Sequence, residues 1–144
     1  SEKQGEVSPE QIMDAFTAEY LEKKEPYHFN RIHVQDFEGE RREDFDTAVE
    51  VLFTDHGVEK SFKAEGNGPI DAVKRGLIQT LGINIKILDY EEHALQAGSN
   101  SKAAAYIHLL NVDTGDVTYG VGVSSNITRA SVRAIFSAVN RLFG

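Results

Sequence analysis

Apolar and polar residues alternate along several short stretches of the chain, and this alternation indicates β-strands. Ile83, Ile85 and Ile87 are separated by polar residues, and Val49 and Val51 have the same spacing. Side chains two residues apart point to the same face of a strand, so these strands would each bury one face. We therefore predict strands near residues 27–37, 45–53, 58–65, 83–90, 103–110 and 117–123, with an irregular or partly helical connection over 91–102.

Apolar positions spaced three to four residues apart predict helices in the remaining segments. One such face consists of Ile70, Val73, Leu77 and Leu81. Gly82 follows directly and is a usual helix end. A second helix is expected over 128–143. A third is expected over 9–24, where Ser8 to Gln11 form a capping-box sequence.

Two strand-to-helix turns in the chain resemble each other. The sixth residue after Asn67 and the sixth after Asn126 are both valine, and a cation follows each valine. Two chance turns would also explain this, but a repeat favours two units of similar architecture, over about 31–81 and 83–143. The predicted fold class is α+β, with two βββα units whose antiparallel sheets each carry a helix.

The first of these turns has the composition of an anion site. Gly66 and Gly68 permit backbone conformations closed to other residues, Asn67 is a potential helix cap, and Pro69 suits the first helical turn. Free N–H groups at a positive helix end favour a carboxylate or a phosphate. An ordinary helix-start turn explains the same residues without a ligand.

Composition narrows the class of protein. The chain has 144 residues, of which 40% are hydrophobic, and a net charge of −8, which argues against nucleic acid and anionic membranes as partners. No cysteine is present, so disulfides and thiolate chemistry are excluded and a cytoplasmic location is expected. No apolar stretch approaches the roughly 20 residues of a membrane span. The first residue is Ser1 rather than methionine, which suggests a fragment or a processed product.

The sequence offers little support for catalysis or metal binding. His28 and His33 are five residues apart on a predicted strand and would face opposite sides, while His93 has acidic neighbours and is the best candidate for a functional histidine. No histidine spacing matches a zinc site, and no nucleophile or nucleotide motif is present. Gly120 and Gly122 are expected to permit close backbone approach within a strand. We predict no catalytic residues and no metal site.

A set of short motifs in a fixed order is the most specific signal. They are Gly66-Asn-Gly-Pro69, Leu88-Asp-Tyr90, Glu92-His-Ala94, Ala103-Ala-Ala-Tyr106, Tyr119-Gly-Val-Gly122, Ser125-Asn-Ile-Thr-Arg-Ala-Ser131 and Ser137-Ala-Val-Asn-Arg141. Residues 27–144 thereby resemble the C-terminal regulatory domain of the 2-isopropylmalate synthase family, in its long form. By the same resemblance, residues 1–26 are a polar tail and the end of a linker subdomain.

The resemblance implies a regulatory role without chemistry of its own. Parent enzymes of this family condense acetyl-CoA with 2-oxoisovalerate on a metal-dependent (β/α)₈ barrel, in the first committed step of leucine biosynthesis. The barrel is missing here, so the chain should be inactive alone and need no cofactor, and the divalent metal belongs to the barrel. The family's domain forms a homodimer, and leucine bound between the paired units inhibits the distant active site.

Matched positions also imply an effector site. Its residues would be Asn67, Gly68, Ile70, Ile87, Tyr90, Ala94, Ser101, Ala103 and Ile127. The chemistry agrees, since N–H groups suit a carboxylate, isoleucines suit an aliphatic tail, and Asp71 or Asp89 would accept from the ammonium group. Ile70 and Ile87 fit an ordinary core equally well. Ser101 stands where related chains often have alanine, which leaves effector selectivity open.

Three other functions are kept as alternatives. The same domain in a citramalate synthase would bind isoleucine instead of leucine. A dimerisation module without a ligand would have the same fold and ignore every amino acid. A stand-alone enzyme, which would depend on His93, is the weakest of the three.

Overall fold

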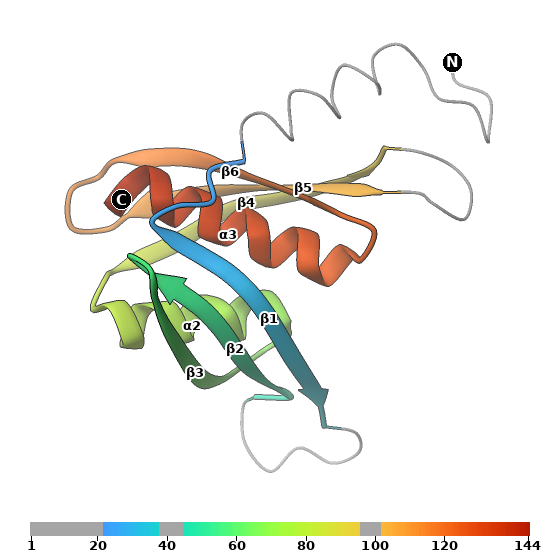
Figure 1. The fold of residues 1–144 in the computed structure, drawn as a ribbon. Helices are drawn as coiled ribbons and strands as arrows, with labels where there is room; N and C mark the ends of the chain where they lie inside the picture. Colours follow the sequence, from blue (N-terminus) through green and yellow to red (C-terminus); the bar gives the residue numbers. More distant parts are fainter. Residues whose placement is uncertain (1–21, 38–44, 96–101) are drawn as a thin grey trace, which may run out of the picture.

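The computed structural model describes residues 22–37, 45–95 and 102–144, which form two units of three strands and a helix (Figure 1). The first unit contains β1 (Tyr27–Asp36), β2 (Thr47–Asp55), β3 (Val58–Gly66) and α2 (Pro69–Leu81). The second contains β4 (Ile85–Ala94), β5 (Ala103–Asn111), β6 (Val117–Ser124) and α3 (Ile127–Phe143). Each sheet is antiparallel in chain order, β1-β2-β3 and β4-β5-β6. The predicted α+β class and the two βββα units are confirmed.

Two predicted segments differ from the structure. β4 continues to Ala94, where we predicted an irregular or partly helical connection from Glu91 onward. The alternation is lost there because polar residues occupy both faces of an edge strand, but backbone pairing with β5 continues, and Ala94 is opposite Ala103. Of the helix predicted over 9–24, residues 9–21 lie outside the described chain, and 22–24 are not helical.

Each unit's first strand contains a register irregularity. In β1 the irregularity falls between Phe29 and Arg31, and β4 has one at the equivalent place. An extra residue in one strand reverses the alternation of side chains beyond it. His28 and His33 are paired with residues four apart on β2, so they share a face, and our prediction that they face opposite sides is wrong. They are still roughly 13 Å apart along the strand, at 3.3 Å per step, too far to share a metal ion.

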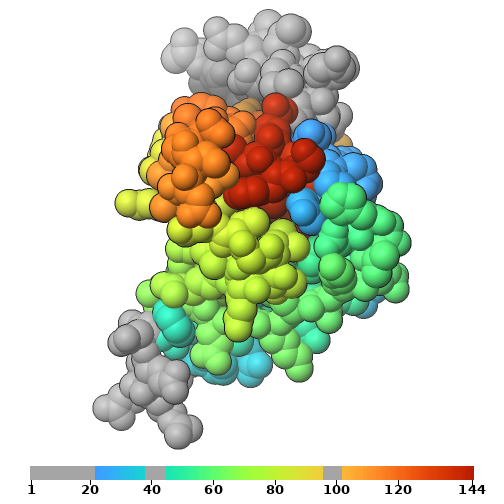
Figure 2. All heavy atoms as spheres, turned by 90° about the vertical axis from the view of Figure 1, so that its left-hand side faces the viewer, coloured from blue at the N-terminus to red at the C-terminus, as the bar shows by residue number. Residues whose placement is uncertain are grey.

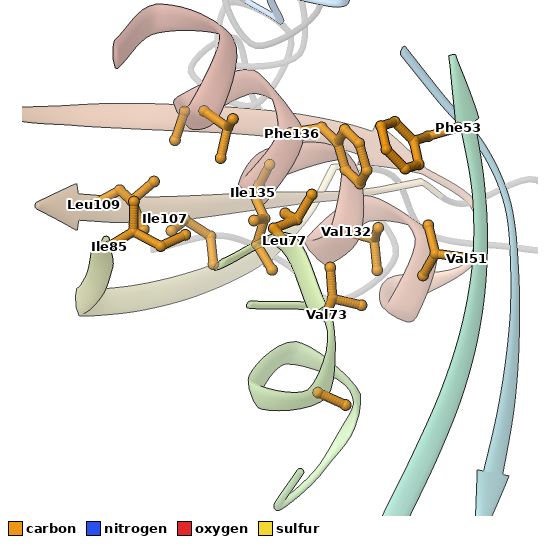
Figure 3. Packing of buried hydrophobic residues seen from close by; sticks show 14 of the residues in the cluster. Val51, Phe53, Val73, Leu77, Ile85, Ile107, Leu109, Val132, Ile135 and Phe136 are labelled. Atoms are coloured by element: carbon orange, nitrogen blue, oxygen red, sulfur yellow. The ribbon is translucent and has the colours of Figure 1, made fainter. Parts of the chain in front are cut away.

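One hydrophobic core joins the two units (Figure 3). Phe53 of β2 lies against Phe136 of α3, with ring centroids 5.8 Å apart. Leu77 of α2 and Ile107 of β5 are fully buried in the same cluster. Each unit supplies side chains to this core that the other covers, and the second unit has in addition a small cluster of its own, Leu95, Ala104, Val121 and Val123. Because the two units share the larger core, we expect them to unfold together.

In Figure 1 both helices begin on the right and end on the left. Figure 2 shows the left-hand end, where the helix C-termini lie between the hairpin turns of the two sheets. At this end buried Asn140 connects α3 to the start of β1. Its side chain accepts from the Tyr27 N–H at 2.8 Å and donates to the Lys23 and Tyr27 carbonyls at 2.9 Å. Among the predicted effector residues, Asn67, Gly68 and Ile70 lie at the start of α2 and Ile127 lies at the start of α3, at the opposite end.

α3 lies unusually close to β6, and glycine makes this possible. A Cβ atom on Gly120 would be 2.0 Å from the carbonyl oxygen of Ala134, and one on Gly122 would be 2.2 Å from that of Ala130. Both distances are shorter than any real contact, so only glycine fits while the helix keeps its position. The predicted close approach at these two glycines is confirmed.

Candidate functional site

The first half of the predicted site is the start of α2. Gly68 is the N-cap residue with φ 94°, a conformation that favours glycine. The helix has no side-chain cap, so our prediction that Asn67 caps it is wrong. Instead, the Asn67 backbone N–H donates to Asp71 Oδ2 at 2.9 Å, and the Gly68 N–H donates to Asp46 Oδ1 at 3.2 Å. Two N–H groups expected to receive a ligand carboxylate therefore already meet carboxylates of the chain.

Asp71 is the electrostatic centre of this helix start. Lys74 Nζ lies 3.1 Å from Asp71 Oδ1, and Arg75 Nε donates to Asp71 Oδ2 at 2.8 Å. Partial burial acts to raise the pKa of Asp71, but the hydrogen bond from Asn67 and the two cations outweigh it, so the pKa lies below the ordinary value. Asp71 is therefore ionised at neutral pH.

The second half of the site is built on Tyr90, which joins β4 to α3. The Tyr90 hydroxyl lies 2.7 Å from Ser131 Oγ and donates to Glu92 Oε2. Ser131 Oγ in turn donates to the Ile127 carbonyl at 2.9 Å, so Tyr90 is linked to the first turn of α3. Burial raises the pKa of Tyr90 above its ordinary value, and the Glu92 carboxylate raises it further. The phenol is therefore neutral at pH 7.

The remaining predicted residues divide between surface and core. Ala94 and Ala103 are directly paired at the end of the second sheet, and Ala103 is also paired with Ser124, three residues before Ile127. Ile127, the first residue of α3, is an apolar side chain that is 39% exposed. Ile70 and Ile87 are half-buried against the common core, as the alternative reading of them required. Ser101 lies outside the described residues, and Asp89, the other candidate ammonium acceptor, accepts from the Tyr90 N–H at 2.9 Å.

Sequence reasoning missed two residues of this arrangement. Asp46 contacts the α2 start from 22 residues away, which no local pattern reveals. Ser131 is the last residue of the motif over 125–131, and the sequence did not indicate its contact with Tyr90. A polar residue at a position that faces the core was the available signal, because a buried hydroxyl requires a partner.

A wide hollow in the described chain does not coincide with the predicted site. It has a volume of about 710 Å³ and lies on the first sheet, among side chains such as His33, Glu50 and Lys63. It contains none of the predicted effector residues. Over residues 22–37, 45–95 and 102–144, no group of three or more potential ligands is placed to hold a metal ion. Within the same ranges, no helix is long and apolar enough to cross a membrane.

Comparison with known proteins identifies relatives over nearly the whole chain. Residues 6–143 match the family model described as LeuA allosteric (dimerisation) domain. The chain is similar to 2-isopropylmalate synthase of Clostridium acetobutylicum, with 38% identity over 136 residues, 94% of this chain and 24% of the relative. It is 41% identical over 138 residues to the enzyme of this name in Kineococcus radiotolerans, covering 95% of this chain and 24% of the relative. The chain therefore spans about a quarter of the length of these relatives.

Proposed function

The chain belongs to the family of LeuA allosteric (dimerisation) domains, and from this premise we propose that it binds leucine between two copies of itself and thereby inhibits a 2-isopropylmalate synthase. The observation that carries the proposal is the family match over 6–143, together with relatives of that name. The expected activity, condensation of acetyl-CoA with 2-oxoisovalerate, and its divalent metal belong to a catalytic barrel elsewhere in the parent. We expect that parent to act in the cytoplasm.

The described geometry supports an amino acid as the ligand. Ile70, Ile87 and Tyr90 present half-buried apolar surface at the edge of one core, where an aliphatic side chain gains about 1.5–3 kcal/mol on burial. Ionised Asp71 supplies a partner for an ammonium group. Ile127 is exposed, and an apolar residue at a site between two copies is expected to become buried only when they pair.

The proposed site is completed across the dimer. The hollow on the first sheet contains none of these residues. The described ones fall mainly into two groups, one at the start of α2 and one around Tyr90 and the start of α3. Ligand binding between copies would make affinity depend on their relative arrangement. Inhibition at a distance then follows if leucine binds one arrangement more tightly than another, since a ligand shifts an equilibrium only by its differential affinity.

Calorimetric titration with leucine, isoleucine and valine, with the mass in solution recorded, tests this proposal. We expect a dimer and saturable binding that favours leucine. Preference for isoleucine would instead identify a domain of the citramalate synthase type. A folded dimer that binds none of the three would contradict the effector proposal.

Substitution of Ile127 distinguishes an effect on leucine binding from an effect on stability. Ile127→Ala removes a partly exposed side chain, so stability should change by no more than about 0.5 kcal/mol. Leucine affinity should fall by roughly tenfold, because a buried aliphatic contact is lost. Val58→Ala is the matched control, since Val58 is 59% exposed on the β3 hairpin and outside the site. Equal leucine affinity in the two variants would remove Ile127 from the site.

One observation favours a second candidate, a dimerisation module without an effector. The Asn67 and Gly68 N–H groups are already satisfied by Asp71 and Asp46, so these two donors require no ligand. This candidate predicts a dimer whose melting temperature ignores leucine at any concentration. The effector proposal predicts stabilisation of about 2.7 kcal/mol at 100 times the Kd.

A further inference from the structure

A second hollow, of about 530 Å³, lies between β1 and the start of α3. Ile32 and Val34 contribute apolar surface to it, and the remaining lining is uncharged polar or basic. These residues are Asn30, Arg31, Asn126, Thr128, Arg129 and Arg133. Among the described residues, no acidic side chain lines the hollow, although the whole chain has 23 acidic residues against 15 lysines and arginines.

The three arginines have no carboxylate partner within the described chain. Arg133 Nη1 donates to the Val123 carbonyl at 2.7 Å, and Arg129 Nη1 lies 3.5 Å from Ser124 Oγ. Both contacts are to neutral oxygens, and neither arginine forms an ion pair with a described residue. Arg31 is exposed, and it too forms no ion pair with a described residue. Glu22 and Arg133 both bond to the backbone of Val123, but they form no ion pair with each other. Three positive charges therefore line one hollow, and none of them is in an ion pair with a described residue.

Arginine is the side chain best suited to hold an oxyanion. Its planar guanidinium presents several donors that match the oxygens of a phosphate or carboxylate in pairs. The Val123 carbonyl fixes one Nη atom of Arg133, which leaves the other donors of that guanidinium for a ligand. The positive end of the 17-residue helix α3 adds to the same field.

We propose that this hollow is an anion site for a small molecule with at least two negative charges on phosphate or carboxylate groups. An anion of this kind relieves repulsion among Arg31, Arg129 and Arg133, and it fits a hollow whose polar lining consists of donors and amides. Leucine has no net charge at neutral pH, so it lacks the charge that this site requires. The inference is independent of leucine binding.

The place related to this hollow by the repeat, between β4 of the second unit and the start of α2 in the first, lacks this chemistry. Counting from Asn67 and Asn126, Arg129 corresponds to Ile70 and Arg133 to Lys74. Counting from the first residues of β1 and β4, Arg31 corresponds to Asp89. The anion site lies between β1 of the first unit and α3 of the second, and it is not a consequence of the repeat.

Titration of the 144-residue chain with inorganic phosphate and, separately, with citrate tests the proposal. Ionic strength is held constant with chloride, and backbone amide shifts are followed by NMR. We expect saturable shifts centred on Thr128 and Arg129, and the tighter of the two anions identifies the ligand class. Linear shifts without saturation for both anions would overturn the proposal.

Charge-matched variants locate the site. Arg129→Gln and Arg31→Gln should each weaken binding of the preferred anion by roughly tenfold or more, since hydrogen bonds to charged groups are lost. Arg129→Lys keeps the charge but loses the paired donors, so a smaller loss is expected. Lys86→Gln, on β4 outside the hollow, should change affinity less than twofold.

Equal weakening in Lys86→Gln would show that only net charge matters and would overturn the site. Mass in solution supplies a second decisive readout. If Arg129→Gln lowers the mass while phosphate and citrate bind nowhere, the arginines contact a second copy instead, and the anion site is rejected. Circular dichroism of each variant confirms that the fold is kept.

Discussion

The starts of α2 and α3 can be compared directly, because Asn67 and Asn126 hold the same place in similar turns. Asn126 caps α3, with its side chain accepting from the Arg129 N–H at 3.0 Å. α2 has no such cap, and carboxylates of Asp71 and Asp46 accept from the N–H groups of Asn67 and Gly68, the two residues before the helix. Carboxylates thus accept from the backbone before α2, whereas arginines line the hollow at the start of α3. A repeated turn preserves the backbone path but does not preserve the chemistry.

The two units also bring helix and sheet together in opposite ways. In the first unit the glycine is on the helix, because a Cβ on Gly76 would be 2.1 Å from the Phe62 ring. In the second unit the glycines are on the strand. Gly120 occupies the place of Phe62, since both are paired with the fifth residue of the middle strand. Close packing of a helix on a sheet requires a small residue on the helix or on the strand, and the two units use different ones.

The largest expected effect tests whether the two units are separable at all. Phe136→Ala empties a position in the shared core and should cost about 3–5 kcal/mol. Urea unfolding followed by circular dichroism and by tyrosine fluorescence should give one coincident transition. Phe37→Ala, at a residue 48% exposed, should stay within about 0.5 kcal/mol. Two separate transitions would show that the units unfold independently.

The second largest loss of stability is expected when a side chain is introduced at the strand glycine that lies against α3. Gly122→Val forces α3 away from β6 and should destabilise by about 1–3 kcal/mol or more. Ala64 is the matched site, because both residues are paired with the third residue of the middle strand. Ala64→Val should cost clearly less, since this position already accommodates a Cβ. Equal unfolding midpoints for both variants would contradict the proposed asymmetry.

The capping difference should produce a smaller effect. Asn126→Ala removes the side-chain acceptor of α3 and should cost about 1 kcal/mol. Asn67→Ala removes no capping hydrogen bond, because α2 has no side-chain cap, and it keeps the backbone N–H that donates to Asp71, so a smaller loss is expected. The measurement is the urea midpoint of each variant. A larger loss for Asn67→Ala would reverse the assignment of the two caps.

The pH dependence of the acidic helix start should be the smallest effect. The folded pKa of Asp71 is lower than its ordinary value of 3.8, so ionised Asp71 contributes stability above that pH. This contribution is lost as pH falls from about 3.8 through the folded pKa. Asp71→Asn should therefore be less stable than the parent sequence at pH 7, and the difference should shrink at pH 3.

Glu59→Gln is the control for this experiment, because Glu59 is exposed and has no ion pair within the described chain. Its stability difference from the parent sequence should be near zero at both pH values. A stability difference for Asp71→Asn that grows in acid would contradict the sign of the proposed pKa shift.

The sequence by itself determined the order of the elements and the fold class. Ile83, Ile85 and Ile87 alternate, and Ile70 and Leu77 share a helical face, because periodicity is a local property of neighbouring residues. Gly82 marked the end of α2 for the same reason, since its left-handed conformation is a local requirement. Local signals were also enough to establish the repeat.

Only the tertiary structure decided the contacts between distant residues. Asp46 reaches Gly68, Tyr90 reaches Ser131, and the three arginines meet across β1 and α3 because the shared core fixes the units against each other. The end of β4 depends likewise on its pairing with β5 rather than on its own polar residues. Periodicity records which face of an element is buried, but burial against a particular partner depends on how the whole chain packs.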